Sequence, residues 1–381
     1  MITEKLYYTD AYLDAFSATV ISSVPTDGGY LVELDRTAFF PEEGGQCADV
    51  GHIGEVRVLD VQERDGHIYH LVEELLDVGV AMECRIDFAE RYERMKCHSA
   101  EHILCGIIHA AYGYENVGFH LGSEDVVFDV SGVMSAAQIA WAEEMANRAV
   151  MENHEVRTYF PTSGELAAID YRAKLDISEG VRIVEIGTVD RCACCAPHVR
   201  VTGEIGIIKI LSFEKHRGGT RIRMIAGLRA LADYRARLAE IQKISELLCT
   251  PQGEVASGVE RLLHENEELR FKIKGAALRA AREAAEALAP TDGNALLYNP
   301  DFGMEELREL SRAASGKVGG ILVALGGVEG DLKYVITSSS VDLRTVTKEM
   351  NSALLGRGGG RAEMLQGAFG ASLESIKEYF R

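Results

Sequence analysis

Two short motifs with matching internal spacing constrain the fold of this 381-residue chain more than any other feature. The first motif, H-S-A-E-H, contains His98 and His102, and the second, C-C-A-P-H, contains Cys194 and His198. Residues four positions apart on a helix lie on one face, about 6 Å apart, so the imidazoles of the first motif can bind one ion. Three imidazoles and one thiolate suit zinc, which takes nitrogen and sulfur ligands at a tetrahedral centre. We therefore expect the segment between the motifs to fold so that both pairs bind a single Zn²⁺ ion.

Each pair alone has other interpretations. A histidine pair at this spacing is often a surface or core accident, and the cysteines around Cys194 could form a redox site, a zinc knuckle or a group of buried thiols. The H-E-x-x-H motif of metalloproteases is absent, because Ser99 stands where that motif has its glutamate. Glu101 precedes the second histidine, about 100° around the helix from it, and mimics that base poorly. The neighbouring Cys195 is a second candidate thiolate, and we favour Cys194 because it reproduces the four-residue offset.

Composition and charge restrict the class of protein. No apolar run approaches the ~20 residues of a membrane span, and the N-terminus lacks the basic-then-apolar plan of a signal peptide. The eight cysteines are scattered apart from a cluster at 192–195, so we expect no disulfide framework and a reduced, cytoplasmic protein without a membrane partner. The net charge of −19 argues against broad nonspecific nucleic-acid binding but is compatible with a local basic face.

The pattern of apolar residues predicts an α+β chain in four parts. Short alternating runs separated by glycine turns predict a small antiparallel β-barrel at 1–88. An α+β zinc-containing domain is expected at 89–226, with the first motif on a helix and the second on a loop after a strand. Apolar residues spaced by three or four predict a helical hairpin or coiled coil at 227–289, either a plain packed hairpin or a dimerisation element. A C-terminal α/β domain is expected at 290–381.

Two clusters of basic residues and glycines are candidates for RNA contacts. The first cluster comprises Lys215, Arg217, Arg221 and Arg223. The second is a predicted loop that contains Gly358, Gly359, Gly360 and Arg361. Three adjacent glycines carry an entropic cost, which close approach of backbone N–H groups to a phosphate would offset. A solvated or flexible loop is the alternative for each cluster.

Five ordered motifs resemble those of one family. They are F-F-P-E-E-G-G-Q at 39–46, H-S-A-E-H at 98–102, G-F-H-L-G at 118–122, C-C-A-P-H-V at 194–199 followed by T-G-E-I-G, and G-R-G-G-G-R-A-E-M-L-Q-G at 356–367. By these motifs the chain resembles, over essentially its whole length, the freestanding alanyl-tRNA editing proteins of the AlaX type in their long form. It is also similar to the editing and C-terminal portions of alanyl-tRNA synthetase without the aminoacylation domain.

The resemblance implies an aminoacyl-tRNA hydrolase. The expected reaction is hydrolysis, in trans, of the ester that joins serine or glycine to alanine tRNA. The four residues His98, His102, Cys194 and His198 stand at the zinc-ligand positions of the family. The helical hairpin and the C-terminal domain look like the region of the synthetase that binds RNA and forms dimers, so either part could form a homodimer; the sequence leaves the oligomeric state open.

Selection against alanine requires polar groups that meet the substrate side chain. A site that hydrogen-bonds a hydroxyl leaves its own groups unpaired when alanine enters. The candidates for substrate binding are Gly44, Gly45, Gln46, His120 and Ser123. No Ser-His-Asp or Cys-His triad is legible, so no nucleophile or base is assigned.

Departures from the family pattern leave two alternatives open. Cys195, Ala196 and Pro197 stand where the family often has glycine, glycine and threonine, and Pro197 removes a backbone donor. A deacylase for another misacylated tRNA, such as that of the threonine system, would share the ligand spacing. A non-catalytic tRNA-binding protein would use zinc for structure alone, because a catalytic zinc keeps one position open.

Overall fold

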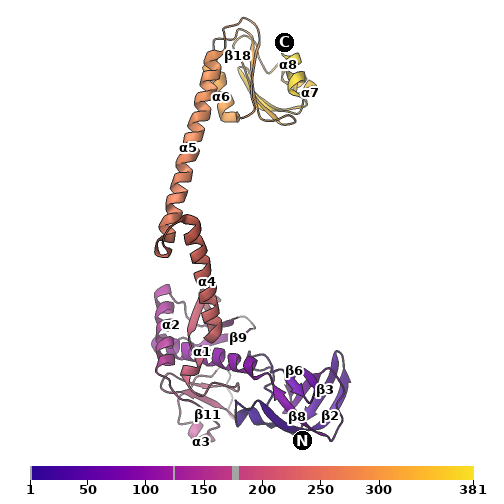
Figure 1. Ribbon diagram of the computed structural model, residues 1–381, viewed down its shortest axis with the longest axis vertical. Coiled ribbons are helices and arrows are strands. Elements are labelled where there is room, and N and C mark those ends of the chain that lie inside the picture. Colours follow the sequence, from indigo (N-terminus) through magenta and orange to yellow (C-terminus); the bar gives the residue numbers. More distant parts are fainter. Residues whose placement is uncertain (1, 123–124, 174–179) are drawn as a thin grey trace. The chain divides into compact units, whose positions relative to one another are not determined.

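A computed structural model describes residues 2–122, 125–173 and 180–381, and it confirms the mixed α+β class expected from the sequence (Figure 1). The chain divides into two compact units, residues 1–240 and 241–381. None of the described helices is long and apolar enough to cross a membrane.

Six antiparallel strands near the N-terminus close into a barrel in the order β2-β3-β7-β6-β5-β8. Their bounds are Ala15–Thr26 (β2), Gly29–Leu34 (β3), Gly51–Ile53 (β5), Val56–Arg64 (β6), His67–Val72 (β7) and Ala81–Ile86 (β8). Alternate side chains of a strand point to opposite faces, and the inward set, with Val20, Val32 and Ile68, is fully buried. Two short strands outside the barrel pair in parallel: Glu4–Lys5 (β1) and Arg36–Thr37 (β4). A 3₁₀ turn at Leu6–Tyr8 follows β1.

Helix α1 (Phe88–Tyr112) is the central element of the domain that follows the barrel. Its middle is buried, with Met95, Ile103 and Leu104 in the main apolar core. The helix ends at Gly113, whose φ of 68° is a left-handed conformation that glycine adopts without strain. This burial places the motif H-S-A-E-H inside the domain.

Two antiparallel sheets and a second long helix complete this domain. One sheet has the order β14-β15-β10-β9 and the other the order β11-β12-β13. The strand bounds are Asn116–Leu121 (β9), Val126–Val130 (β10), Val156–Tyr159 (β11), Ile183–Ile186 (β12), Asp190–Ala193 (β13), Ile208–His216 (β14) and Gly219–Ala226 (β15). The helices are Ala136–Met151 (α2), begun by a capping box at Ser135, and the single turn Ser163–Leu166 (α3), with a 3₁₀ turn at Thr202–Ile205.

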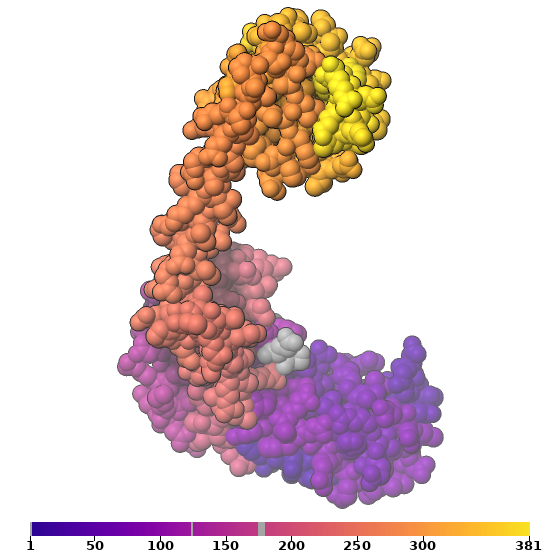
Figure 2. Space-filling view, turned by 45° about the horizontal axis from the view of Figure 1, so that its top comes forward, coloured from indigo at the N-terminus to yellow at the C-terminus, as the bar shows by residue number. Residues whose placement is uncertain are grey.

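Two helices occupy the segment in which a hairpin is expected. Helix α4 spans Gly227–Leu248 and α5 spans Val255–Ala287, joined through a short 3₁₀ turn at Gln252–Glu254. Much of α5 lies on the surface (Figure 2). Three residues of its predicted apolar seam are largely exposed: Leu262 at 53%, Leu269 at 55% and Ile273 at 69%. These side chains are not covered within the described chain, so the partner of this seam is still a prediction.

The C-terminal domain is a five-stranded sheet with helices on both faces. Strand order is β16-β17-β18-β20-β19, with β16 and β17 parallel and the other pairs antiparallel. The bounds are Ala295–Asn299 (β16), Ile321–Gly326 (β17), Leu332–Ser338 (β18), Gly356–Arg361 (β19), Met364–Phe369 (β20), Met304–Ala313 (α6), Thr347–Ala353 (α7) and Leu373–Tyr379 (α8). The end of α5 and α6 share one core cluster with the sheet, and α7 and α8 share the other.

The prediction of a loop at the glycine motif is wrong. The residues Gly358, Gly359, Gly360 and Arg361 lie in the edge strand β19. A Cβ atom at Gly358 would clash with the Tyr334 hydroxyl and the carbonyl oxygen of Gln366. At Gly359, by contrast, a Cβ would meet nothing within 4 Å. Close packing between strands, invisible in the local sequence, therefore explains Gly358 without a flexible loop.

Candidate metal centre and cavity

The two predicted ligand pairs meet at one buried centre. His98 and His102 lie one turn apart on α1, and Cys194 and His198 lie in the loop that follows β13. The ligand atoms of all four side chains lie within 4.8 Å of one another. His198 Nε2 is 3.4 Å and His98 Nε2 is 3.7 Å from the Sγ atom of Cys194. No histidine of the group is more than 4% exposed, so the group is compact and dry enough to hold one metal ion.

Each imidazole of this centre has a different hydrogen-bond partner on its Nδ1 atom. The pairs are Gln46 Oε1 with His98 at 2.8 Å, Asp190 Oδ2 with His102 at 3.2 Å, and Ser99 Oγ with His198 at 2.9 Å. Because every Nδ1 is engaged, each ring offers its Nε2 atom as a ligand. Histidines that bind zinc almost always donate their other N–H to such a partner. The donor set and its supports therefore fit Zn²⁺.

Electrostatics distinguish the two adjacent cysteines. Burial raises the pKa of the Cys194 thiol, but its interactions with His98 and His198 and its hydrogen bond with His102 outweigh burial and hold the pKa well below its usual value. Burial and the charge of Cys194 raise the pKa of Cys195. Within the described chain, the four-residue group contains Cys194 and not Cys195. Cys194 is therefore the thiolate that a cation would meet.

Asp190 is a charged support of His102. The guanidinium of Arg172 donates from Nε and Nη2 to the two oxygens of Asp190, at 2.8 Å each. Burial raises the pKa of Asp190, but the hydrogen bonds from His102 and Arg172 outweigh it and the net shift is downward. Burial lowers the pKa of His102, and the bond to Asp190 reverses that shift. His102, Asp190 and Cys192 also form a group of metal-ligating type, but both Asp190 oxygens are already engaged by Arg172.

Arg182 holds the loop that carries Cys194. Its Nη1 donates to the carbonyl oxygens of Cys194 and Ala196, at 2.9 Å each, and the side chain is buried at 5% exposure. Pro197 follows and has no N–H to satisfy, which suits a buried position in this loop. The loop is thus fixed by a cation that contacts its backbone.

A tight glycine turn delivers Gln46 to His98. The backbone N–H groups of Glu43 and Gln46 donate to each other's carbonyls at 3.2 and 3.0 Å. Gly44 and Gly45 have φ values of +64° and +87°, as a type I′ turn requires. The Gly45 carbonyl accepts from the N–H of Leu121 at 2.8 Å, which joins the turn to β9. Gln46 is consequently fully buried.

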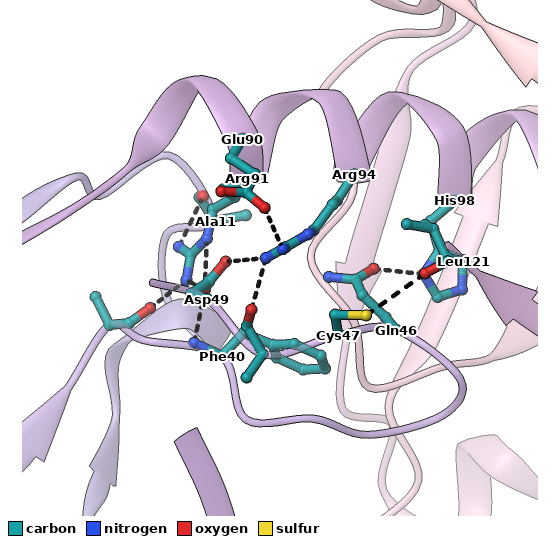
Figure 3. Close-up of polar contacts among 12 residues, drawn as sticks. Ala11, Phe40, Gln46, Cys47, Asp49, Glu90, Arg91, Arg94, His98 and Leu121 are labelled. Atoms are coloured by element: carbon teal, nitrogen blue, oxygen red, sulfur yellow. Dashed lines mark hydrogen bonds and ion pairs between the residues drawn. The ribbon is translucent and has the colours of Figure 1, made fainter. Parts of the chain in front are cut away.

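An ion pair fixes the segment after this turn against α1 (Figure 3). Asp49 accepts from Nε of Arg91 at 3.0 Å and from the backbone N–H of Phe40 at 2.7 Å. Arg94 adds a hydrogen bond to the carbonyl oxygen of Ala48 at 2.6 Å. Two arginines of α1, seven and four residues before His98, therefore tie the segment after the glycine turn to the helix that carries the histidine pair.

A cavity of 360 Å³ opens over the centre. Its wall includes three of the ligand side chains, His98, His102 and Cys194, together with Gly44 of the glycine turn. Further polar residues on the wall are Tyr8, Glu43, Glu101, Asn116, Arg172 and Arg182. The centre is thus accessible to a small polar ligand from one side.

The structure separates the predicted substrate-binding residues. Gly44 lines the cavity, whereas Gly45 packs against Phe119 and Gln46 lies behind His98, where its amide contacts the ring. His120 is exposed on β9 and does not line the cavity. Ser123 lies outside the described residues.

The predicted RNA-binding residues also differ in their surroundings. Arg221 donates to both oxygens of Asp129 at 2.8 Å, and Arg223 donates to Asp125 at 2.7 Å. Lys215 is exposed and forms no ion pair with the described residues. Arg217 is likewise exposed, and no carboxylate of the described ranges pairs with it. The first basic cluster therefore contains two cations without an acidic partner in the described chain.

Sequence reasoning missed the residues that support the ligands. They are Ser99, Phe119, Arg172, Arg182 and Asp190, and the Phe119 ring lies 4.6 Å from that of His98. Asp190 lies four residues before Cys194, and this proximity is only a weak indication that it supports a ligand. The sequence around Arg172 does not predict its role, because that role depends on a contact with Asp190 of β13 that forms only in the folded chain.

The chain is similar to alanyl-tRNA editing proteins and to parts of alanine–tRNA ligases. The family model described as "Threonyl and Alanyl tRNA synthetase second additional domain" matches residues 181–223. The alanyl-tRNA editing protein AlaX-L of Pyrococcus horikoshii is 28% identical over 98% of this chain and 96% of its own length. The alanyl-tRNA editing protein Aarsd1 of Danio rerio is 27% identical over 94% of this chain and 92% of its own. An alanine–tRNA ligase of Pyrobaculum neutrophilum is 31% identical over the whole chain, which spans only 44% of that ligase.

Proposed function

We propose that this chain, whose similarity to alanyl-tRNA editing proteins of the AlaX type runs along nearly its whole length, is an aminoacyl-tRNA deacylase. It hydrolyses the ester of alanine tRNA that carries the wrong amino acid, with serine and glycine as the proposed amino acids. The observation that carries this proposal is the buried group of three imidazoles and one thiolate, three of whose side chains line a 360 Å³ cavity.

The four side chains of the centre would hold one Zn²⁺ ion per chain. Bound zinc supplies Lewis acidity and a fixed point of orientation for a carbonyl or an amine. The residues of the chain contribute the rest: Gln46, Asp190 and Ser99 orient the imidazoles, and the wall around Gly44 shields the ester from bulk water. An ester is already activated, so positioning and stabilisation of charge are the main tasks of such a site.

The tRNA partner would contact the surface near the cavity and the C-terminal domain. Lys215 and Arg217 are the proposed phosphate contacts of the first unit, and the edge strand β19 with Arg361 those of the second. Exposed seam positions of α5 support the proposal that this helix contributes to a homodimer.

A non-catalytic zinc protein that binds tRNA is the second candidate. The observation in its favour is that four protein ligand atoms lie together, which is typical of closed, structural zinc sites. A deacylase of the threonine system shares the matched family model and is a third outcome of the same assay.

The test compares release of amino acids from mischarged tRNA. Alanine tRNA carrying serine, glycine or alanine, and threonine tRNA carrying serine, are incubated with the native protein and with His102→Ala. We expect release of serine from alanine tRNA by the native protein, little release of alanine, and loss of activity and of bound zinc in His102→Ala. His109→Ala, on the exposed side of the same helix, is the matched control and keeps full activity. Zinc binding without release of any amino acid would favour the non-catalytic candidate.

A further inference from the structure

We propose that Glu101 binds the α-ammonium group of the aminoacyl ester in the cavity. The proposal rests on the function proposed above and deepens it, because it names the part of the substrate that this residue recognises. Glu101 immediately precedes His102 on α1, is only 2% exposed, and lines the same cavity as His98 and His102.

The carboxylate of Glu101 is held by neutral donors only. Its Oε1 accepts from the amide of Asn116 and from the thiol of Cys105, at 3.2 Å for the thiol. Asn116 also lines the cavity, and its own Oδ1 accepts from the N–H of Gly118 at 3.1 Å, so the Asn116 amide can offer only its NH₂ group to Glu101. These contacts fix the carboxylate in place without neutralising it.

Within the described residues, no ion pair joins Glu101 to a lysine, arginine or histidine, and the neighbouring His102 and Arg172 pair with Asp190 instead. Arg172, a basic residue on the same wall, uses Nε and Nη2 on Asp190. Arg182 uses Nη1 on the ligand loop. A buried carboxylate without a cation is unfavourable, so this position is suited to a ligand that brings a positive charge.

The chemistry of an aminoacyl ester supplies that charge at the right place. Its α-amino group is a cation below its pKa, and its nitrogen is two bonds from the ester carbonyl carbon. A substrate whose carbonyl lies at the centre therefore presents its ammonium to a neighbouring group on the cavity wall, and Glu101 is adjacent to His102 along the helix. The salt bridge would fix the α-carbon, so that the amino acid side chain takes a defined direction in the cavity.

The inference predicts selection for a free amino group. Glu101→Gln keeps the acceptor oxygen for Asn116 and Cys105 but removes the charge. Seryl-tRNA and the same tRNA carrying the α-hydroxy analogue of serine are compared as substrates. Because hydrogen bonds to charged groups are worth more than neutral ones, we expect Glu101→Gln to lower kcat/KM for the seryl ester roughly 10- to 100-fold and to change that for the hydroxy ester less than about threefold.

Controls separate this proposal from its alternatives. Glu115→Gln, at an exposed position after α1, should leave both substrates unaffected. Zinc content and melting temperature of Glu101→Gln should equal those of the native protein. Equal losses on both substrates, or no loss on either, would overturn the proposal. Absence of hydrolysis of either ester by the native protein would instead contradict the proposed function.

A binding measurement on the native protein does not depend on how the variant folds. Adenosine that carries serine through a stable 3′-amide bond is titrated alongside its α-hydroxy counterpart. We expect the amine to bind at least about tenfold more tightly, and equal affinities would refute a role for Glu101 in recognition of the ammonium.

Discussion

The three histidines of the candidate centre are held by an amide, a carboxylate and a hydroxyl, and each partner comes from a different part of the chain. Gln46 lies on a turn between β4 and the barrel strand β5, Asp190 begins β13, and Ser99 lies on α1 itself. Of these three supports, only Gln46 is far in sequence from every ligand. The barrel and the domain that contains α1 must therefore both be folded before all three imidazoles have their hydrogen-bond partners.

Gln46→Ala removes the oxygen that accepts the hydrogen bond from His98 Nδ1, so the ring loses its fixed orientation. Loss of such a partner of a metal-binding histidine typically lowers metal affinity about 10- to 100-fold. We expect a fall of that size in zinc affinity, measured by competition with a chromophoric chelator. Deacylation of seryl-tRNA should fall with it, while affinity for tRNA stays unchanged.

Gln242→Ala, on the exposed side of α4, is the matched control for this measurement. If Gln46→Ala bound zinc as the native protein does but lost discrimination against alanine, Gln46 would act on the substrate and not on His98.

The meeting of the two residue pairs could be predicted from the sequence because the spacing within each pair is a local property of a helix and of a short loop. The structure shows these side chains within 4.8 Å of one another. The roles of Gln46 and His120 could not be predicted in this way, because they depend on the face that a strand or turn presents after folding. Gln46 lies behind His98, and His120 is exposed on β9 and does not line the cavity. The motifs indicated that these residues lie near the centre, but they did not indicate which groups the side chains contact.

At the scale of elements, the glycine motif of the C-terminal domain shows what a local argument misses. Three consecutive glycines favour a loop on conformational grounds, yet they form an edge strand paired with β20. The reason lies in Tyr334, whose ring stacks on Phe369 at 4.2 Å and whose hydroxyl approaches Gly358. Only a glycine leaves room there.

A matched pair of substitutions tests this explanation. Gly358→Ala places a Cβ against the Tyr334 hydroxyl and the backbone of β20, so we expect it to destabilise the C-terminal domain by about 1–3 kcal/mol. Gly359→Ala meets open space and should change stability by no more than about 0.5 kcal/mol. Amide hydrogen exchange of β18 and β20 in the full chain measures both effects, and equal effects would contradict the packing argument.

The barrel contains a buried histidine outside the candidate centre, and it makes stability depend on pH. His70 Nδ1 donates to the carbonyl oxygen of Val32 at 3.1 Å and its Nε2 lies 2.9 Å from the Thr37 hydroxyl, which suits the neutral ring. Burial lowers the pKa of His70 from 6.5 to about 4. The unfolded chain therefore binds a proton that the folded barrel excludes as the pH falls below 6.5.

The sign of the pH effect follows from that difference in pKa. The contribution of His70 to stability is complete above pH 6.5 and is lost progressively towards pH 4. Between pH 7 and pH 5 we expect a loss of about 2 kcal/mol. Hydrogen exchange of the barrel strands at the two pH values measures it. His70→Gln should remove this part of the pH dependence, and an unchanged slope in that variant would assign the effect to other groups.

At the scale of the whole molecule, charge restricts how the chain can bind tRNA. The net charge is −19, so contact with a polyanion requires local groups of cations. Arg221 and Arg223 are engaged by Asp129 and Asp125, whereas Lys215 and Arg217 have no acidic partner in the described ranges. The short hairpin between β14 and β15 is thus the part of this cluster that is available to phosphates.

Salt dependence tests that assignment. Each phosphate contact contributes about 0.7 to 0.9 to the slope of log K against log salt concentration, because binding releases counterions. We expect tRNA affinity to fall steeply as salt rises, and the double variant Lys215→Ala, Arg217→Ala to reduce the slope by between about 1 and 2. Arg223→Ala should change the slope less, since removal of that arginine also frees the carboxylate of Asp125. Affinity that does not vary with salt would exclude this hairpin as a phosphate contact and leave recognition to the cavity and the C-terminal domain.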